Sequence, residues 1–277
     1  LHVKIKRSSM KKSFKLLVLF LLFSPPLAAS GACPDWPKIF QKNRGEGVAS
    51  SKKKVLVASF QNNGLRDDDW LSESFYFILS DYFDVFKQFR SVRTRTDRRF
   101  EAGDSSEALK GGRLMGADYV LYGFFKRDTT KPILKVFARF VDVKKGTEMD
   151  RLSWEIEFPK NESLFRLFFQ IADDASKRFS GGKAGDKILA PYIHESRSVE
   201  SLRHYSIGRS FLEAAQMEDL DKAIEELGLA IQNDYNYVPA YVAQAEALLM
   251  KNFSRRILGK PDRKNLEEAS VLLARAS

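Results

Sequence analysis

Residues 116–123 have the sequence Gly-Ala-Asp-Tyr-Val-Leu-Tyr-Gly, and two phenylalanines follow directly. Glycine is common just past the end of a helix, so Gly116 is expected to end a helix over residues 105–115. The apolar run after Asp118 lacks polar alternation, which is typical of a strand buried on both faces. A helix that leads into such a strand indicates an α/β domain.

The preceding residues predict elements of the same kinds. Residues 54–60 form a compact apolar run that favours another buried strand, and residues 89–94 favour a further one. Between them, residues 70–83 place apolar side chains at helical spacing behind the acidic run 67–69, which suits the start of a helix. The helix is rich in aromatic residues, which we interpret as core, with an exposed partner-binding edge as the alternative. These residues are Trp70, Phe75, Tyr76, Phe77, Tyr82, Phe83 and Phe86.

The following residues predict a hairpin and a helix. Residues 133–143 and 152–158 alternate between apolar and polar side chains, as half-buried strands do. Residues 162–179 predict an amphipathic helix. The order is then β-α-β-α-β-β-β-α, which predicts an α/β sandwich domain with one mixed sheet covered by helices.

A family resemblance rests on these residues. The stretch 116–123, the Trp70-Leu71 helix start, and the strand end at 140–143 followed by Gly146-Thr147 together resemble the TolB amino-terminal-like domain family. The resemblance covers about residues 53–180. It implies an open α/β sandwich used in envelope assemblies, with no known catalytic site.

The N-terminal residues predict a targeting segment. Met10 is followed by lysines, then by the apolar run 16–23 and by small residues at 28–32. A basic region, a short apolar region and small residues are typical of a secretory signal peptide, which we place within residues 1–32. The apolar run is shorter than the roughly 20 residues that a membrane-spanning helix needs.

Cys33 directly follows the small residues, and this arrangement resembles a bacterial lipoprotein signal. The resemblance implies that Cys33 receives lipid and anchors the protein to a membrane. Ser30 departs from the pattern, which usually has leucine there. Ordinary cleavage after Ser30 or Ala32 is therefore an alternative. Residues 33–52 contain prolines, glycines and serines, and are interpreted as a tether.

A glycine-rich linker over residues 181–198 separates the α/β domain from a predicted helical region at residues 199–277. Small and large apolar side chains recur there with the same spacing. The two sets are Ala223, Leu227 and Ala230, and then Ala269, Leu273 and Ala276. This all-α pattern resembles about two tetratricopeptide repeats, each of which pairs two helices. Two repeats leave an apolar edge, so the chain is either truncated or covered there by a partner or another domain.

The repeat resemblance also implies a protein-binding groove on the first helix of each repeat. The groove residues that this register predicts are Tyr205, Arg209, Leu212, Glu246 and Leu249. Mixed polar and apolar side chains suit an extended peptide or a partner helix.

Composition argues against several other classes. Cys33 is the single cysteine, which excludes an internal disulfide framework and a multi-cysteine zinc site. Six of the ten net positive charges fall in residues 1–32, so the rest of the chain does not favour nucleic-acid binding. The densest basic cluster is interpreted as a solvated strand end and loop, or as an anion or partner patch. It comprises Arg90, Arg93, Arg95, Arg98 and Arg99.

No catalytic set, metal site or cofactor site can be argued from these residues. The sequence therefore predicts a non-enzymatic adaptor or scaffold of the cell envelope, lipid-anchored in the periplasm or at the outer membrane, that binds envelope proteins. Two alternatives remain open. One is an accessory module of a signalling enzyme, and the other is a subunit of an outer-membrane secretion or assembly complex.

Overall fold

The computed structural model describes residues 52–93, 100–181 and 196–276, which belong to one compact unit. The predicted signal peptide, Cys33 and nearly all of the tether lie outside the described residues. So do residues 182–195 of the predicted linker.

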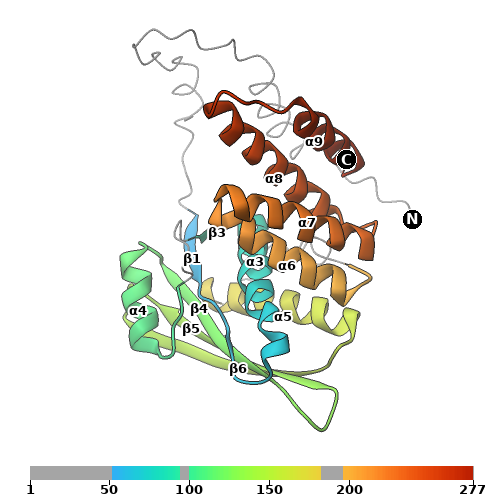
Figure 1. The fold of residues 1–277 in the computed structure, drawn as a ribbon. Helices are drawn as coiled ribbons and strands as arrows, with labels where there is room; N and C mark the ends of the chain where they lie inside the picture. The colour runs from blue at the N-terminus through green and yellow to red at the C-terminus, as the bar shows by residue number, and fades with distance from the viewer. Residues whose placement is uncertain (1–51, 94–99, 182–195, 277) are drawn as a thin grey trace, which may run out of the picture. The chain divides into compact units, whose positions relative to one another are not determined.

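Six strands form one mixed sheet in the order β3-β1-β4-β5-β6, with β2 paired to β4 (Figure 1). Strand β1 runs parallel to its neighbours β3 and β4, whereas β5 runs antiparallel to its neighbours β4 and β6. The predicted mixed sheet is therefore confirmed. The strands are β1 (Lys53–Val57), β2 (Gln61–Asn62), β3 (Phe89–Val92), β4 (Tyr119–Arg127), β5 (Ile133–Asp142) and β6 (Thr147–Glu157).

Three helices cover the two faces of the sheet. Helices α3 (Trp70–Val85) and α5 (Asn161–Phe179) share the larger apolar core with one face, and α4 (Ser105–Leu114) packs on the other. Asp104 caps α4 by accepting a hydrogen bond from the Glu107 backbone nitrogen. Gly116, with φ +63°, follows the end of α4, as the sequence predicts.

At position 123 of strand β4, the surrounding core leaves room only for glycine. A Cβ atom at Gly123 would lie 2.1 Å from the Phe137 carbonyl oxygen and 2.6 Å from the Phe60 ring. Those distances are far below van der Waals contact, so any side chain would push β5 and the core apart.

The predicted elements recur in the predicted order, with three differences. Strand β6 spans Thr147–Glu157, whereas the sequence predicts residues 152–158. Strand β2 has only two residues and no periodicity from which it could be predicted. The acidic run 67–69 does precede α3, but Asp68 is buried in a short 3-10 turn and pairs with Arg127 at 3.0 Å. Burial raises the pKa of Asp68, and Arg127 opposes that shift.

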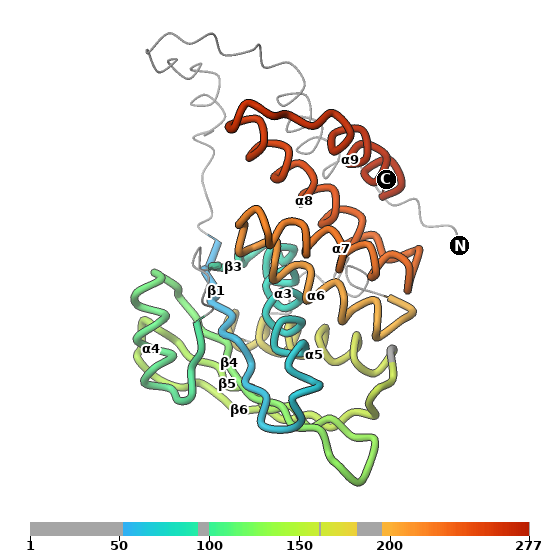
Figure 2. The backbone as a smooth tube through the Cα atoms, in the orientation of Figure 1, coloured from blue at the N-terminus to red at the C-terminus, as the bar shows by residue number. Residues whose placement is uncertain are grey.

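In the described residues 196–276, a run of four helices follows the sheet domain (Figure 2). Each helix packs against the next along the chain. Gly208 allows α6 and α7 to approach closely, because a Cβ atom there would lie 2.7 Å from Leu227 Cγ. The helices are α6 (Val199–Ala214), α7 (Met217–Asn233), α8 (Val238–Ile257) and α9 (Arg263–Arg275).

The first set of the predicted spacing marks the core, and the second set does so only in part. Ala223, Leu227 and Ala230 are fully buried and Ala269 nearly so, whereas Leu273 and Ala276 are half-buried. The same apolar core also includes α3 and the sheet, so the α/β and helical parts are packed together. Within the described ranges, no helix has the length and hydropathy that a membrane-spanning segment requires.

Candidate interaction site

The structure places the five predicted groove residues on α6 and α8, and it gives the two helices different surroundings. On α6, Tyr205 and Leu212 are buried and Arg209 has only 15% of its side chain exposed. On α8, the Glu246 side chain is 52% exposed and Leu249 is half-buried. The α6 residues therefore serve mainly internal contacts, while the α8 residues remain accessible.

Helix α3 of the sheet domain covers α6. The hydroxyls of Ser74 and Ser206 form a buried hydrogen bond of 2.7 Å between the two helices. The Arg209 guanidinium lies over the Phe77 ring, 5.2 Å from its centroid, which is a favourable cation–π distance. Phe77 itself is fully buried.

Two tyrosines meet beside this contact. Tyr205 of α6 packs edge-to-face against Tyr237, which directly precedes α8, with ring centroids 5.1 Å apart. Burial raises the pKa of both tyrosines well above the usual range, so both hydroxyls stay neutral at physiological pH. The aromatic pair thus contributes packing rather than charge.

A charged cluster surrounds the junction of α3, α6 and α8. Arg93, just after β3, pairs with Asp81, with Asp84 at 3.3 Å and with Glu213 at 4.0 Å. Arg209 Nη1 lies 3.8 Å from a Glu246 carboxylate oxygen. Four carboxylates thus face two guanidinium groups. We call the set the junction cluster; its members are Asp81, Asp84, Arg93, Arg209, Glu213 and Glu246.

The electrostatics of Arg209 keep it charged. Burial lowers the pKa of Arg209, but Tyr205, Asp81 and the nearby carboxylates of Glu246 and Glu213 outweigh burial, so the net shift is upward. Its Nε atom is buried and donates to no acceptor among the described residues. The guanidinium therefore depends on Phe77 and the carboxylates for compensation.

The sequence identified Arg209 and Glu246 but missed the other four members of the junction cluster. Asp81, Asp84 and Glu213 are ordinary acidic residues on their own helices. Arg93 was assigned to a basic cluster of which only Arg90 and Arg93 are described. A signal was nevertheless present: α3 carries aromatic residues around its whole circumference, which is typical of a helix covered on both sides.

Helix α8 presents to solvent a row of four apolar residues and one glutamate, of which two are half-buried and three exposed. Five residues at spacings of four, three, four and four share one side of the helix, and this row spans about 22 Å. Phe253 is 55% exposed and Ile257 is 71% exposed, and Leu258 after the helix is 68% exposed. We call the row the α8 stripe; it comprises Val242, Glu246, Leu249, Phe253 and Ile257.

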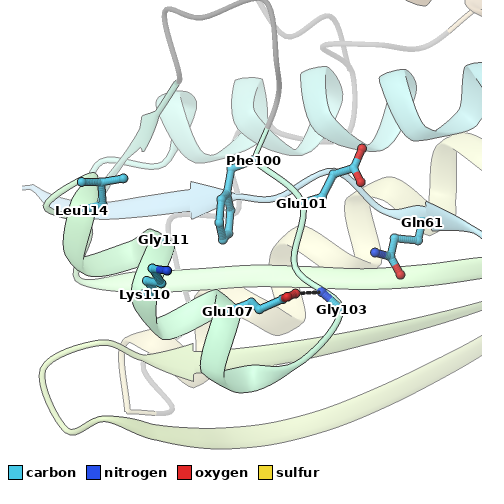
Figure 3. A pocket seen from close by; sticks show the side chains of 8 residues that line it. All are labelled: Gln61, Phe100, Glu101, Gly103, Glu107, Lys110, Gly111 and Leu114. Atoms are coloured by element: carbon cyan, nitrogen blue, oxygen red, sulfur yellow. Dashed lines mark hydrogen bonds between the residues drawn. The ribbon is translucent and has the colours of Figure 1, made fainter.

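Figure 3 shows a separate pocket of about 520 Å³ between α4 and the segment that precedes it. Phe100 and Leu114 contribute apolar surface, and Lys110 and Glu107 contribute opposite charges. The Glu107 carboxylate already accepts a hydrogen bond of 2.8 Å from the Gly103 backbone nitrogen. The polar groups therefore do not define one class of ligand.

No group of three or more potential metal ligands occurs among residues 52–93, 100–181 and 196–276. His204 Nδ1 lies 2.7 Å from a Glu226 carboxylate oxygen, a contact that joins α6 and α7. His194 and Cys33 lie outside the described residues.

No family model and no curated protein matches the chain. Solved structures similar to it include TolB from Acinetobacter baumannii, which is 14% identical with a TM-score of 0.34. That match covers 47% of this chain and 28% of TolB, so the chain spans less than a third of that protein.

Two shorter proteins are also among the similar structures. The LpoB C-terminal domain from Escherichia coli is 19% identical, with a TM-score of 0.30, over 43% of this chain and 93% of that domain. Lipoprotein GNA1162 from Neisseria meningitidis is 19% identical, with a TM-score of 0.30, over 46% of this chain and 96% of its own.

Proposed function

We propose that this protein is a non-enzymatic adaptor of the cell envelope that binds partner proteins through its helical part. The observation that carries the proposal is the α8 stripe, in which Phe253 and Ile257 are more than half exposed on one side of a single helix. Contiguous exposed apolar side chains on a folded surface are typical of protein interaction sites.

The helical part is proposed to be two tetratricopeptide repeats, with α6 and α7 as the first and α8 and α9 as the second. The close approach of Gly208 to Leu227 supports this, since paired helices in such repeats need small residues between them. In this arrangement α6 and α8 both face the groove. Because Tyr205 and Leu212 are buried, we assign partner binding to Glu246, Leu249 and the rest of the α8 stripe, with Arg209 at its edge.

The proposed location rests on the N-terminal sequence. A signal peptide within residues 1–32 would direct export, and lipid on Cys33 would anchor the protein at the periplasmic side of a membrane. Metabolic labelling with a fatty-acid analogue tests this directly. Label is expected in the native chain and not in Cys33→Ala. An unlabelled native chain would contradict lipidation of Cys33, and export with ordinary cleavage of the signal peptide would remain.

The binding function is tested by affinity capture from envelope extract with full-length protein. Phe253→Asp should abolish capture of a partner, because it places a charge between Leu249 and Ile257, within the apolar part of the α8 stripe. Val271→Asp is the matched control, because Val271 is 54% exposed and lies about 200° around α9 from the buried Ala269. Capture that is equal in both variants would contradict the proposed function.

A further inference from the structure

The α8 stripe leaves its partner unspecified, and the neighbouring α6 shows how such a helix is covered in this protein. Helix α3 lies against α6 through a buried hydroxyl pair, Ser74 and Ser206, and through the Phe77 ring on Arg209. Arg209 also reaches Glu246 of the α8 stripe at 3.8 Å. The covered side of α6 and the open side of α8 are therefore adjoining parts of one surface.

The backbone of α8 restricts the form of an occupant. The amide and carbonyl groups along α8 are already paired within the helix, so α8 cannot pair with an extended peptide through main-chain hydrogen bonds, as a sheet edge does. A helix satisfies its own backbone and can offer only side chains, as α3 does on α6. The straight row of about 22 Å matches one side of a partner helix of about four turns.

Charge distinguishes the two ends of the α8 stripe. At the Glu246 end, the junction cluster has four carboxylates and two guanidinium groups, and Glu246 and Asp84 are the most exposed of these acids. At the Ile257 end, Lys251 pairs with Asp221, and Arg255 pairs with Asp262 at 3.1 Å. The acid excess at the Glu246 end calls for a basic side chain on the partner.

We infer that the α8 stripe binds an amphipathic helix of a partner protein, which packs apolar residues on Leu249, Phe253 and Ile257 and brings a lysine or arginine to Glu246. The inference rests on the proposed adaptor function and narrows it to one kind of partner. In the complex, the partner helix would lie on α8 beside α3, and Glu246 would exchange part of its contact with Arg209 for the partner's cation.

Photo-cross-linking in cells identifies the occupant. Benzoylphenylalanine in place of Phe253 keeps an aromatic side chain at that position of the full-length protein. The expected adduct is a partner segment with apolar residues at helical spacing and a basic residue toward one end. An extended or acidic segment, a second copy of this chain, a phospholipid adduct or the absence of an adduct would overturn the inference.

Charge exchange tests the role of Glu246. Glu246→Lys should weaken binding of the cross-linked partner by about tenfold, since repulsion replaces attraction. An acidic residue in place of the partner's cation should restore it. Glu267→Lys on the exposed side of α9 is the matched control, and an unchanged circular dichroism spectrum of Glu246→Lys excludes misfolding. Binding that depends on Phe253 but not on Glu246 would overturn this inference and leave the adaptor function intact.

Discussion

Helices α6 and α8 each begin a helical pair, but α3 covers one and solvent faces the other. On α6, Tyr205 and Leu212 are buried, and Arg209 lies over Phe77. On α8, the corresponding side shows Phe253 and Ile257 to solvent. The comparison teaches that a repeat-like surface can be divided, with one part holding the protein together and the other part free for a partner.

The largest expected effect is on the covered helix. Tyr205→Ala should lower the free energy of unfolding by about 3–5 kcal/mol, because it leaves a cavity beside Tyr237. Tyr235→Ala is the matched change, since Tyr235 is 71% exposed, and it should cost about 0.5 kcal/mol or less. Denaturant titration measures both; equal costs would show that Tyr205 is not buried in solution.

Asp234, at the turn between α7 and α8, should have the next largest effect. One carboxylate oxygen accepts from Ser196 Oγ and the Arg197 nitrogen, both at 2.7 Å, and the other accepts from the Asn236 nitrogen at 3.0 Å. An asparagine has only one side-chain oxygen, so it can accept the hydrogen bonds of only one of the two carboxylate oxygens. Asp234→Asn should therefore cost about 2 kcal/mol at neutral pH.

The same residue predicts a pH dependence. Burial raises the pKa of Asp234, but the hydrogen bonds from Arg197, Ser196 and Asn236 outweigh burial and lower it overall. The pKa of an aspartate in the unfolded chain is about 3.9. Because the folded pKa is lower, the ionised Asp234 stabilises the folded protein above that pH, and this stabilisation is lost as the pH falls through the folded pKa. The stability gap between native protein and Asp234→Asn should narrow below about pH 4. A constant gap between pH 7 and pH 3 would contradict the assigned hydrogen bonds.

Arg209→Met should have a smaller effect. The change keeps an apolar stem on Phe77 but removes the cation, so the expected cost is about 1 kcal/mol. Arg255→Met on α8 removes an ion pair with Asp262. The Arg255 side chain is 40% exposed, so the loss should lower the free energy of unfolding by less than about 0.5 kcal/mol. If Arg255→Met lowered the free energy of unfolding more than Arg209→Met, the result would contradict the assignment of α6 as the covered helix and α8 as the exposed one.

The ends of the two helices provide the smallest test. Both helices are followed by a residue with positive φ. After α8 it is Gly259, with φ +72°, and after α6 it is Ala215, with φ +56°. An alanine in the left-handed region is strained, so Ala215→Gly should stabilise the protein by about 0.5–1 kcal/mol. Thermal unfolding measures the shift, and a lower melting temperature would contradict the assigned backbone conformation.

The sequence predicted the sheet domain well because its signals are local. Gly116 ends α4, and the alternation of β5 places Leu134, Val136 and Ala138 in the core as expected. The covering of α6 could not be predicted in the same way, since Ser74 and Ser206 are 132 residues apart. Only the aromatic residues on every side of α3 hinted that the sheet alone does not cover that helix.

The hydrogen bond between Ser74 and Ser206 has a consequence for how such proteins diversify. Because α3 is apolar on both sides, the sheet on one side of it and the helices on the other depend on each other for stability. Exchange of the helical part for an unrelated one would leave Phe77 facing water, and the hybrid would aggregate unless its new first helix matched α3. Variation in this lineage is therefore expected to concentrate on α8 and α9, where partners can change without disturbing that match.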